Sequence, residues 1–243
     1  MFDGVPLGEY VDASPARQPE PVTLEGSYVT LVPLVPSHAP ALYEQLCVNS
    51  PEATWAYMSA GPFTDLGSFT THISNFSTSR DPLFFTVLPR QDIVSAKGGG
   101  AVLVRAGTPA GYVSLMRIDA RSRAVEVGHI TLGAALQRTR PATEALFLVL
   151  RHCLAGLGFR RVEWKCDALN ARSRRAAARY GFVPEGVFRR HMIVRGRNRD
   201  TAWFSMVDGE EWEARREAFE KWLDPGNFDE RGQQKKKLED FRG

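Results

Sequence analysis

The part of the sequence best suited to chemistry is a short basic turn that joins an expected strand to an expected helix. The strand covers residues 124–132, and the turn holds Arg138 and Arg140, with Pro141 at the expected first helical position. The first N–H groups of a helix have no intrahelical partner, and the helix dipole adds partial positive charge. Proline at that position costs no hydrogen bond, because the N–H group that it lacks would have no partner within the helix. The turn could bind an anion such as a phosphate, although a capped helix with two solvated arginines would contain the same residues.

A second helix start follows the next expected strand, residues 161–167. Asn170 stands at the expected N-cap and Ser173 three residues later, which by itself is an ordinary capping arrangement. Ligands of α/β sheets bind beyond the carboxyl ends of the strands, and both helix starts would open at the same sheet edge. We therefore expect the ligand site at this edge.

The elements that would position these residues alternate between strand and helix patterns. The expected strands are 22–34, 83–88, 101–105, 111–118, 124–132, 161–167, 183–194 and 199–207, and the expected helices are 37–48, 68–79, 141–157, 170–180 and 212–223. This order predicts an α/β fold with a mixed central sheet of about seven strands and helices on both faces. Residues 124–167 would form a right-handed parallel crossover.

Composition narrows the class of protein. The 243 residues are 43% apolar and 24% charged, which is typical of a soluble globular chain. A net charge of +3, from 31 basic and 28 acidic residues, is too balanced to indicate nucleic-acid binding. The three cysteines form no metal or disulfide pattern and no apolar run could cross a membrane, so we expect a cytoplasmic protein without a metal. We expect residues 1–21 to be a flexible leader, 22–208 one domain, and 209–243 a helix with a charged, solvated tail.

Two motifs resemble a known family. Gln137-Arg-Thr-Arg-Pro-Ala142 is similar to the acyl-CoA turn Q/R-x-x-G-x-G/A of the GNAT N-acetyltransferases. The more specific motif is Asn170-Ala-Arg-Ser173, continued by Tyr180-Gly-Phe182 and Glu185-Gly-Val-Phe-Arg189. It resembles the branch that includes the RimJ/RimL ribosomal-protein acetyltransferases. The likeness spans about residues 24–206 and implies the GNAT fold, acetyl-CoA as acyl donor and an amine as acceptor.

The sequence departs from the first motif at position 140. The family usually has glycine there, which lets backbone N–H groups approach the pyrophosphate closely, whereas this chain has Arg140 followed by Pro141. Proline removes one N–H and disfavours the α region for the residue before it. Part of the phosphate binding would then pass to the guanidinium groups of Arg138 and Arg140.

The resemblance implies direct attack of the amine on the thioester, which needs a base, an oxyanion donor and an acid for the thiolate. Glu126 is the candidate base, with pairing to an arginine as its alternative role. Backbone N–H groups near Ile130 and Leu132 are candidate oxyanion donors. Ser173 could protonate or orient the sulfur, since the position where many relatives have an acidic tyrosine is Ala177. The full candidate donor site is Ile130, Leu132, Gln137, Arg138, Thr139, Arg140, Ala142, Thr143, Asn170 and Ser173.

Other reactive side chains are expected to have structural roles. His129 fits a core histidine better than a base, and Tyr180 fits packing. Cys153 and Cys166 fall on apolar faces without an activating neighbour, which argues against a covalent acyl-enzyme.

The acceptor is less well determined by the sequence. We expect its pocket to be built by the loop with Trp55, Tyr57 and Phe63 and by the last hairpin. That hairpin carries a basic cluster, which would usually be a solvated face but could recognise an acidic substrate or RNA; its members are Arg189, Arg190, His191, Arg195, Arg197 and Arg199. The acceptor would be a small amine or a protein N-terminus, and the protein a monomer or homodimer. The alternatives are a non-catalytic acyl-CoA-binding module and, less favoured, an RNA-associated protein.

Overall fold

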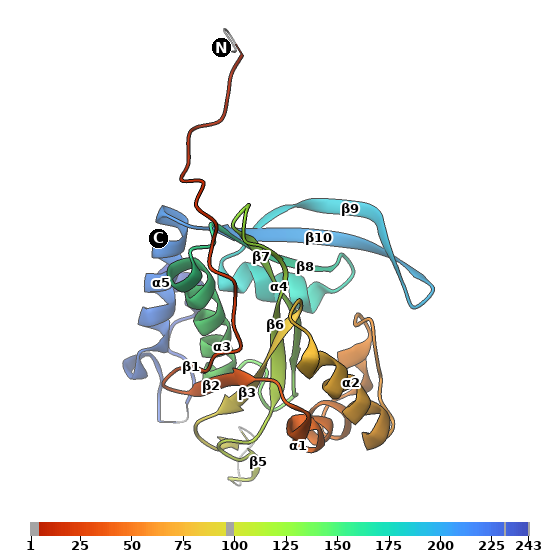
Figure 1. Ribbon diagram of the computed structural model, residues 1–243. Helices are drawn as coiled ribbons and strands as arrows, with labels where there is room; N and C mark the ends of the chain where they lie inside the picture. The colour runs from red at the N-terminus through yellow and green to blue at the C-terminus, as the bar shows by residue number, and fades with distance from the viewer. Residues whose placement is uncertain (1–4, 96–99, 231, 243) are drawn as a thin grey trace.

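A computed structural model describes residues 5–95, 100–230 and 232–242 (Figure 1). Its central feature is an eight-stranded sheet in the order β1-β2-β3-β6-β7-β8-β10-β9. All neighbouring strands are antiparallel except β7 and β8, which are parallel. The predicted α/β fold with a mixed sheet is confirmed, and the expected parallel crossover joins β7 to β8 through α3.

The strands of the main sheet lie close to their predicted positions. They are β1 (Leu24–Glu25), β2 (Val29–Pro33), β3 (Leu83–Pro89), β6 (Gly111–Asp119), β7 (Ala124–Leu132), β8 (Arg161–Asp167), β9 (Val183–Val194) and β10 (Arg197–Val207). The predicted first strand is split into β1 and β2. The predicted strand at residues 101–105 belongs instead to a separate pair formed by β4 (Ile93–Val94) and β5 (Val102–Val104).

The helices cover both faces of the sheet, as predicted. They are α1 (Ala39–Tyr43), α2 (Leu66–Thr78), α3 (Arg140–Arg151), α4 (Ala171–Tyr180) and α5 (Glu210–Leu223). Because successive residues of a strand point to opposite faces, β3 contributes to two cores. Phe84 packs into the core under α1 and α2, whereas Phe85 belongs to the larger core that contains residues of α3 and α5.

The ends of α3 and α4 follow from local chemistry. The Thr139 side chain accepts a hydrogen bond from the Ala142 N–H (3.2 Å), which caps α3. The turns that continue α3 end at Gly158, whose φ of 81° is readily adopted only by glycine. Asn170 caps α4 as predicted, with its Oδ1 accepting from the Ser173 N–H (3.0 Å).

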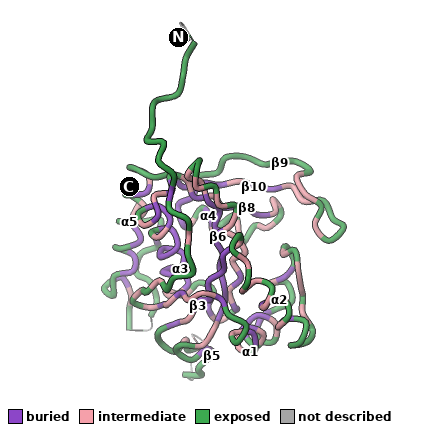
Figure 2. Tube along the Cα trace, in the orientation of Figure 1, coloured by how far each residue is buried: buried purple, intermediate pink, exposed green. Residues whose placement is uncertain are grey.

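The N-terminal segment is extended and contacts the body of the protein near its end. Residues 1–4 of the expected leader lie outside the described residues, and the segment from Val5 onward extends from the body with exposed side chains (Figures 1 and 2). The leader is held where the Ala16 and Arg17 N–H groups donate to the carbonyls of Ala120 and Leu157.

Most described residues of the charged C-terminal tail are exposed, but the tail is anchored to the body of the protein at a few points. Leu238 is 1% exposed and belongs to the main core. The side chain of Asn227 donates to the carbonyls of Trp222 and Lys236, and Arg242 donates to the carbonyls of Ala178 and Arg179 at the end of α4. A few apolar and amide side chains therefore fix a segment whose average composition is charged.

Candidate active site

The sheet opens at its only parallel pair among the described strands. The pairing of β7 with β8 runs from Ala124 opposite Arg161 to Glu126 opposite Glu163, and the later residues of the two strands separate. On its other side β7 stays paired with β6, but the register shifts between Gly128 and Thr131. His129 lies in this irregularity with a φ of 47°. The result is an opening at the carboxyl end of the two strands, where ligands of α/β sheets bind.

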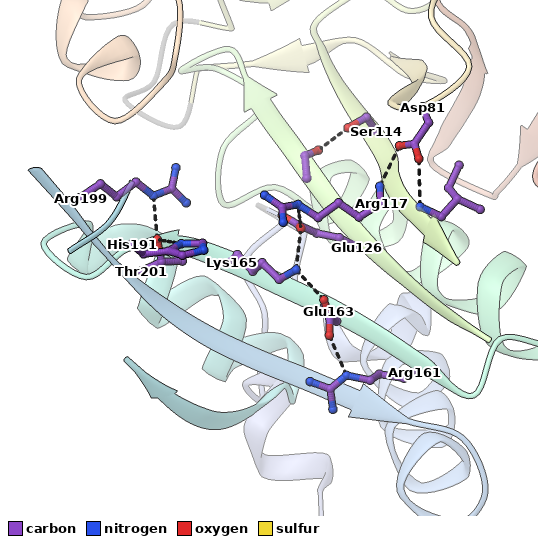
Figure 3. A network of polar contacts seen from close by, with 12 residues as sticks. Asp81, Ser114, Arg117, Glu126, Arg161, Glu163, Lys165, His191, Arg199 and Thr201 are labelled. Atoms are coloured by element: carbon purple, nitrogen blue, oxygen red, sulfur yellow. Dashed lines mark hydrogen bonds and ion pairs between the residues drawn. The ribbon is translucent and has the colours of Figure 1, made fainter. Parts of the chain in front are cut away.

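Glu126 lies where the two strands begin to separate, and its residue is 6% exposed. Its Oε2 lies 3.1 Å from Arg117 Nε and 3.1 Å from Lys165 Nζ (Figure 3). Lys165 Nζ also contacts Glu163 Oε2 at 2.6 Å, and Glu163 in turn contacts Arg161 at 2.8 Å. The predicted base is thus one member of a chain of alternating charges.

Burial and charge act on Glu126 in opposite directions. Burial raises the pKa of its carboxyl group above the ordinary value, and the charges of Lys165 and Arg117 offset only part of that shift. The pKa of Glu163 is lowered: burial alone would raise it, but hydrogen bonds from Lys165 and Arg161 outweigh that effect. Two neighbouring carboxyl groups are therefore set to different proton affinities, an arrangement suited to acid–base chemistry.

The basic turn before α3 places its two arginines differently. Arg138 is exposed and has a φ of 63°. The guanidinium of Arg140 lies 4.5 Å from the ring centre of Tyr28 and 3.4 Å from that of Phe228. Arg140 is therefore stacked between the beginning and the end of the chain, whereas Arg138 remains free to meet a ligand at the helix start.

The other predicted residues of the turn hold it together. Gln137 donates from its side chain to the Leu132 carbonyl (2.9 Å). Thr139 Oγ1 accepts a hydrogen bond from the Ala142 N–H, and Thr143 Oγ1 donates one to the Thr139 carbonyl (3.2 Å). These side chains stabilise the turn, and their hydrogen-bonding groups are largely used within it.

The residues at the start of α4 are partly engaged as well. Ser173 Oγ accepts a hydrogen bond from Trp164 Nε1 (3.0 Å), which leaves the hydroxyl hydrogen available to another acceptor. Ile130 and Leu132, the predicted backbone donors, lie on the part of β7 that has left β8. Ile130 and Leu132 thus lie on β7 beyond its pairing with β8, and Asn170 and Ser173 lie at the start of the helix that follows β8.

Sequence reasoning missed Arg179, in the last turn of α4. Its Nη1 donates to Thr143 Oγ1 in the first turn of α3 (3.2 Å), and its guanidinium lies 5.0 Å from the Trp222 ring centre. In the sequence, Arg179 could have been recognised as a basic residue two positions before Gly181, where the helix was expected to end. An α-helix rises 1.5 Å per residue, so α4 separates Arg179 from Asn170 by about 14 Å.

The residues expected to have structural roles are surrounded by apolar or aromatic side chains. His129 packs on Phe76 and Phe84, with ring centres 5.4 and 5.3 Å apart, and burial lowers its pKa. Burial raises the pKa of both Cys153 and Cys166, which keeps them as unreactive thiols. Tyr180 is buried against Trp164 and Phe219.

The loop and the hairpin expected to form the acceptor pocket contact each other and the segment before α4. Trp55 is 1% exposed and is part of the core. Tyr57 is exposed, and its hydroxyl donates to the Leu169 carbonyl (3.2 Å). Arg195, in the β9–β10 turn, reaches the Trp55 carbonyl (3.4 Å). The loop, the hairpin and the segment before α4 therefore meet around one rim.

Two searches of the described residues gave negative results. No group of three or more His, Cys, Asp or Glu side chains there could hold a metal ion. No described helix combines the length and apolarity needed to cross a membrane.

Comparison with known proteins identifies the family. Residues 29–183 match the family described as an acetyltransferase (GNAT) domain. A Bacillus subtilis (strain 168) protein named "Putative ribosomal N-acetyltransferase YdaF" is 25% identical over 189 residues, which cover 76% of this chain and 94% of that protein.

Two crystal structures extend the match. A GCN5-related N-acetyltransferase from Brucella melitensis is 41% identical, with a TM-score of 0.86 over 95% of this chain and 98% of that chain. A probable acetyltransferase of the GNAT family from Chromobacterium violaceum ATCC 12472 is 33% identical, with a TM-score of 0.73 over 86% of this chain and 98% of that one. The chain belongs to the GNAT acetyltransferase family and is an acyltransferase that acts on an amine.

Proposed function

We propose that this protein is a cytoplasmic enzyme that transfers the acetyl group of acetyl-CoA directly to a primary amine, with Glu126 as the base. The observation that carries the proposal is the position of the Glu126 carboxylate. It is buried at the point where β7 and β8 separate, and its pKa is raised by burial. A base with a raised pKa accepts a proton more readily near neutral pH than an ordinary carboxylate does.

The donor would lie along the opening between the turn before α3 and the start of α4. Its pyrophosphate would bind at the α3 N-terminus, with Arg138 as the free guanidinium and Arg179 close to the first turn. The thioester would lie toward Asn170 and Ser173. The separation of about 14 Å along α4, at 1.5 Å per residue, suits an elongated donor bound at both ends.

The reaction needs only proton and acyl movement. The ammonium form of the acceptor gives a proton to Glu126, and the free amine attacks the thioester carbonyl carbon. Backbone N–H groups near Ile130 and Leu132 would stabilise the resulting oxyanion. The C–S bond then breaks as the nitrogen of the intermediate loses its second proton. The thiolate takes a proton from Ser173 or from water, and the proton released by the nitrogen replaces it, so that the products are the neutral amide and the free thiol. Lys165 and Arg117 hold the Glu126 carboxylate in place through its Oε2.

The test begins with calorimetric titration of the protein with acetyl-CoA and continues with a thiol-release assay over a panel of amines. We expect a Kd below about 100 μM, which corresponds to about −5.5 kcal/mol, and amine-dependent release. Glu126→Gln should retain acetyl-CoA binding and lose about 10²-fold or more in kcat. Glu163→Gln is the matched control, because it removes the neighbouring carboxylate of the same network.

Two results would contradict the proposal. Unchanged turnover in Glu126→Gln would remove the base from its role. Acetyl-CoA binding without thiol release from any amine would favour the non-catalytic acyl-CoA-binding module.

A further inference from the structure

Positive charge is concentrated in one part of the chain. Residues 168–199 contain nine arginines and a single acidic residue, Glu185. The arginines are Arg172, Arg174, Arg175, Arg179, Arg189, Arg190, Arg195, Arg197 and Arg199. The whole chain carries a formal charge of only +3. The anionic donor would account for Arg179, but an amine acceptor does not account for the arginines of the hairpin, because an amine in water is itself cationic at neutral pH.

The sheet divides these arginines between two sides. Trp203 pairs with Lys165 across β10 and β8, and Lys165 Nζ lies 3.8 Å from the Trp203 ring centre. Since side chains alternate along a strand, Arg197 and Arg199 share the face of Trp203 and therefore that of Lys165 and Glu126. The contact of Arg199 Nε with Thr201 Oγ1 (3.2 Å) agrees with this placement (Figure 3).

The arginines of α4 lie on the other side of the sheet. Ser173 contacts Trp164, which alternates with Lys165 along β8 and so faces away from Glu126. Arg172 and Arg175 belong to this helix. They serve below as a comparison with the same charge on the opposite side.

The charges around Glu126 balance without the arginines at the turn of the hairpin, Arg195, Arg197 and Arg199. Three cations, Arg117, Lys165 and Arg161, are paired with three carboxylates, those of Glu126, Glu163 and Glu185. In the described part of the chain, no carboxylate lies within ion-pair distance of the guanidinium of Arg195, Arg197 or Arg199. The far end of the Glu126 face therefore carries uncompensated positive charge.

This charge lies at the rim of the acceptor side. The Arg195 side chain bonds the Trp55 carbonyl, and Tyr57 of the same loop bonds the Leu169 carbonyl. Arg197 is exposed and Arg199 is partly buried. A bound acceptor that extends from Glu126 along β10 would run toward these groups.

We infer that the acceptor is the N-terminal amine of a peptide with acidic side chains a few residues further on, a conclusion that rests on the proposed acetyl transfer. Four residues of β10 separate Trp203, which contacts Lys165, from Arg199. At about 3.3 Å per residue this is about 13 Å. An extended peptide whose amine lies at Glu126, at the level of Trp203, would place its fifth residue level with Arg199 and its seventh level with Arg197. A small amino acid is too short to reach from the base to these arginines.

The test uses three peptides that share their first four residues and carry glutamate, alanine or lysine at positions five to seven. Thiol release with acetyl-CoA should show the highest kcat/KM for the glutamate peptide, mainly through a lower KM. Two solvent-exposed ion pairs support a preference of about tenfold over alanine. The preference should shrink as salt rises, because the Debye length is only about 8 Å at 0.15 M.

Two double variants locate the effect. Arg197→Ala with Arg199→Ala should abolish the preference for glutamate while leaving the rate with the alanine peptide unchanged. Arg172→Ala with Arg175→Ala removes the same charge from the opposite side and should keep the preference. Fluorescence anisotropy of the labelled glutamate peptide, measured with CoA present, should show the same order of affinities without turnover.

The outcomes separate this inference from the proposed function. Equal kcat/KM values for the three peptides, or acetylation of small amines alone, would overturn the inference and leave acetyl transfer intact. Preference lost equally in both double variants would also overturn it, since the recognition would then be a net-charge effect. Failure of every amine and peptide to release thiol would contradict the proposed function itself.

Discussion

Two side chains of similar sequence context have different roles here. Arg138 and Arg140 both belong to the turn before α3, and both were predicted to bind phosphate. Only Arg138 is exposed without a stacking partner, whereas Arg140 is covered on both faces by Tyr28 and Phe228. A cation between two aromatic rings is stabilised by about 0.5–2 kcal/mol per contact. The guanidinium at position 140 thus contributes packing where the family usually has glycine.

Arg117 provides the sharpest prediction at this scale, because its positive charge opposes the burial effect on Glu126. Removing that charge in Arg117→Gln should raise the pKa of Glu126 further. A base must be deprotonated to act, so the rising limb of the kcat/KM–pH profile should move to higher pH. Arg161→Gln, which removes a charge from Glu163 rather than from Glu126, should move the limb less. If the rising limb of the profile did not move in Arg117→Gln, the limb would reflect the titration of a group other than Glu126.

Arg138 allows stability and binding to be separated. Its φ of 63° lies in the left-handed region, which costs a residue with a Cβ about 1 kcal/mol relative to glycine. Arg138→Gly should therefore stabilise the protein by up to about 1 kcal/mol while weakening its affinity for acetyl-CoA. Urea unfolding and calorimetric titration would measure the two effects. Arg151→Gly, a substitution in the last turn of α3, should destabilise the helix by about 1 kcal/mol. If Arg138→Gly changed stability and affinity in the same direction, Arg138 would not be a strained residue that binds acetyl-CoA.

At the scale of elements, the turn before α3 is held by segments far from it in sequence. Phe228 stacks on Arg140 and also packs edge-on against Trp222 of α5, with ring centres 5.1 Å apart. Glu144, one turn further along α3, accepts hydrogen bonds from the backbone N–H groups of Ser27, Tyr28 and Val29 at 2.6–2.9 Å. The start of α3 is therefore clamped from the first strands on one side and from the tail on the other.

A double-mutant cycle tests the clamp. Phe228→Ala should destabilise the protein by about 1–3 kcal/mol, since it loses one cation–π and one aromatic contact. Phe228→Leu keeps bulk and should cost less. Urea unfolding of Phe228→Ala, Arg140→Ala and the double variant should give losses that do not add, because the two residues share one contact. Strict additivity would show that the stacking has no energetic role.

The sequence was informative about local elements and less so about their contacts. The caps at Asn170 and Gly158 follow from short-range backbone chemistry, so residue type alone predicted them. The break between β1 and β2 did not follow, because it depends on the buried Glu144 carboxylate more than a hundred residues away. The partners of Arg140, Arg179 and the tail are likewise set by long-range packing, which no local pattern encodes. The acid–base network at Glu126 needed the register of β7 with β8.

At the scale of the whole molecule, four partly buried histidines contribute to the response to acid. Burial lowers the pKa of His38, His129 and His152, and it lowers the pKa of His72 to about 4. Each histidine then binds a proton more weakly in the folded than in the unfolded state. Stability should be full above about pH 6.5, the ordinary histidine value, and should fall as the pH decreases toward 4.

Urea unfolding at pH 7, 6 and 5 would measure this loss. His72→Gln removes one of the four groups and should flatten the dependence over that range. His191→Gln is the control, because that histidine lies outside the buried set on β9. A steeper fall in the free energy of unfolding between pH 7 and pH 5 for His72→Gln would show that His72 does not contribute to the loss of stability in acid.

The contact of Arg140 with Tyr28 and Phe228 also bears on how the enzyme is made. A chain emerging from the ribosome folds from its N-terminus, and contacts of large sequence separation form late. The strands, α3 and α4 would be synthesised before Phe228 is available, but the turn proposed to bind the donor would still lack one of its two supports. Newly made enzyme would thus become competent to bind acetyl-CoA only once synthesis has passed the tail. Fusions or truncations at the C-terminus should accordingly be more harmful than those at the N-terminus.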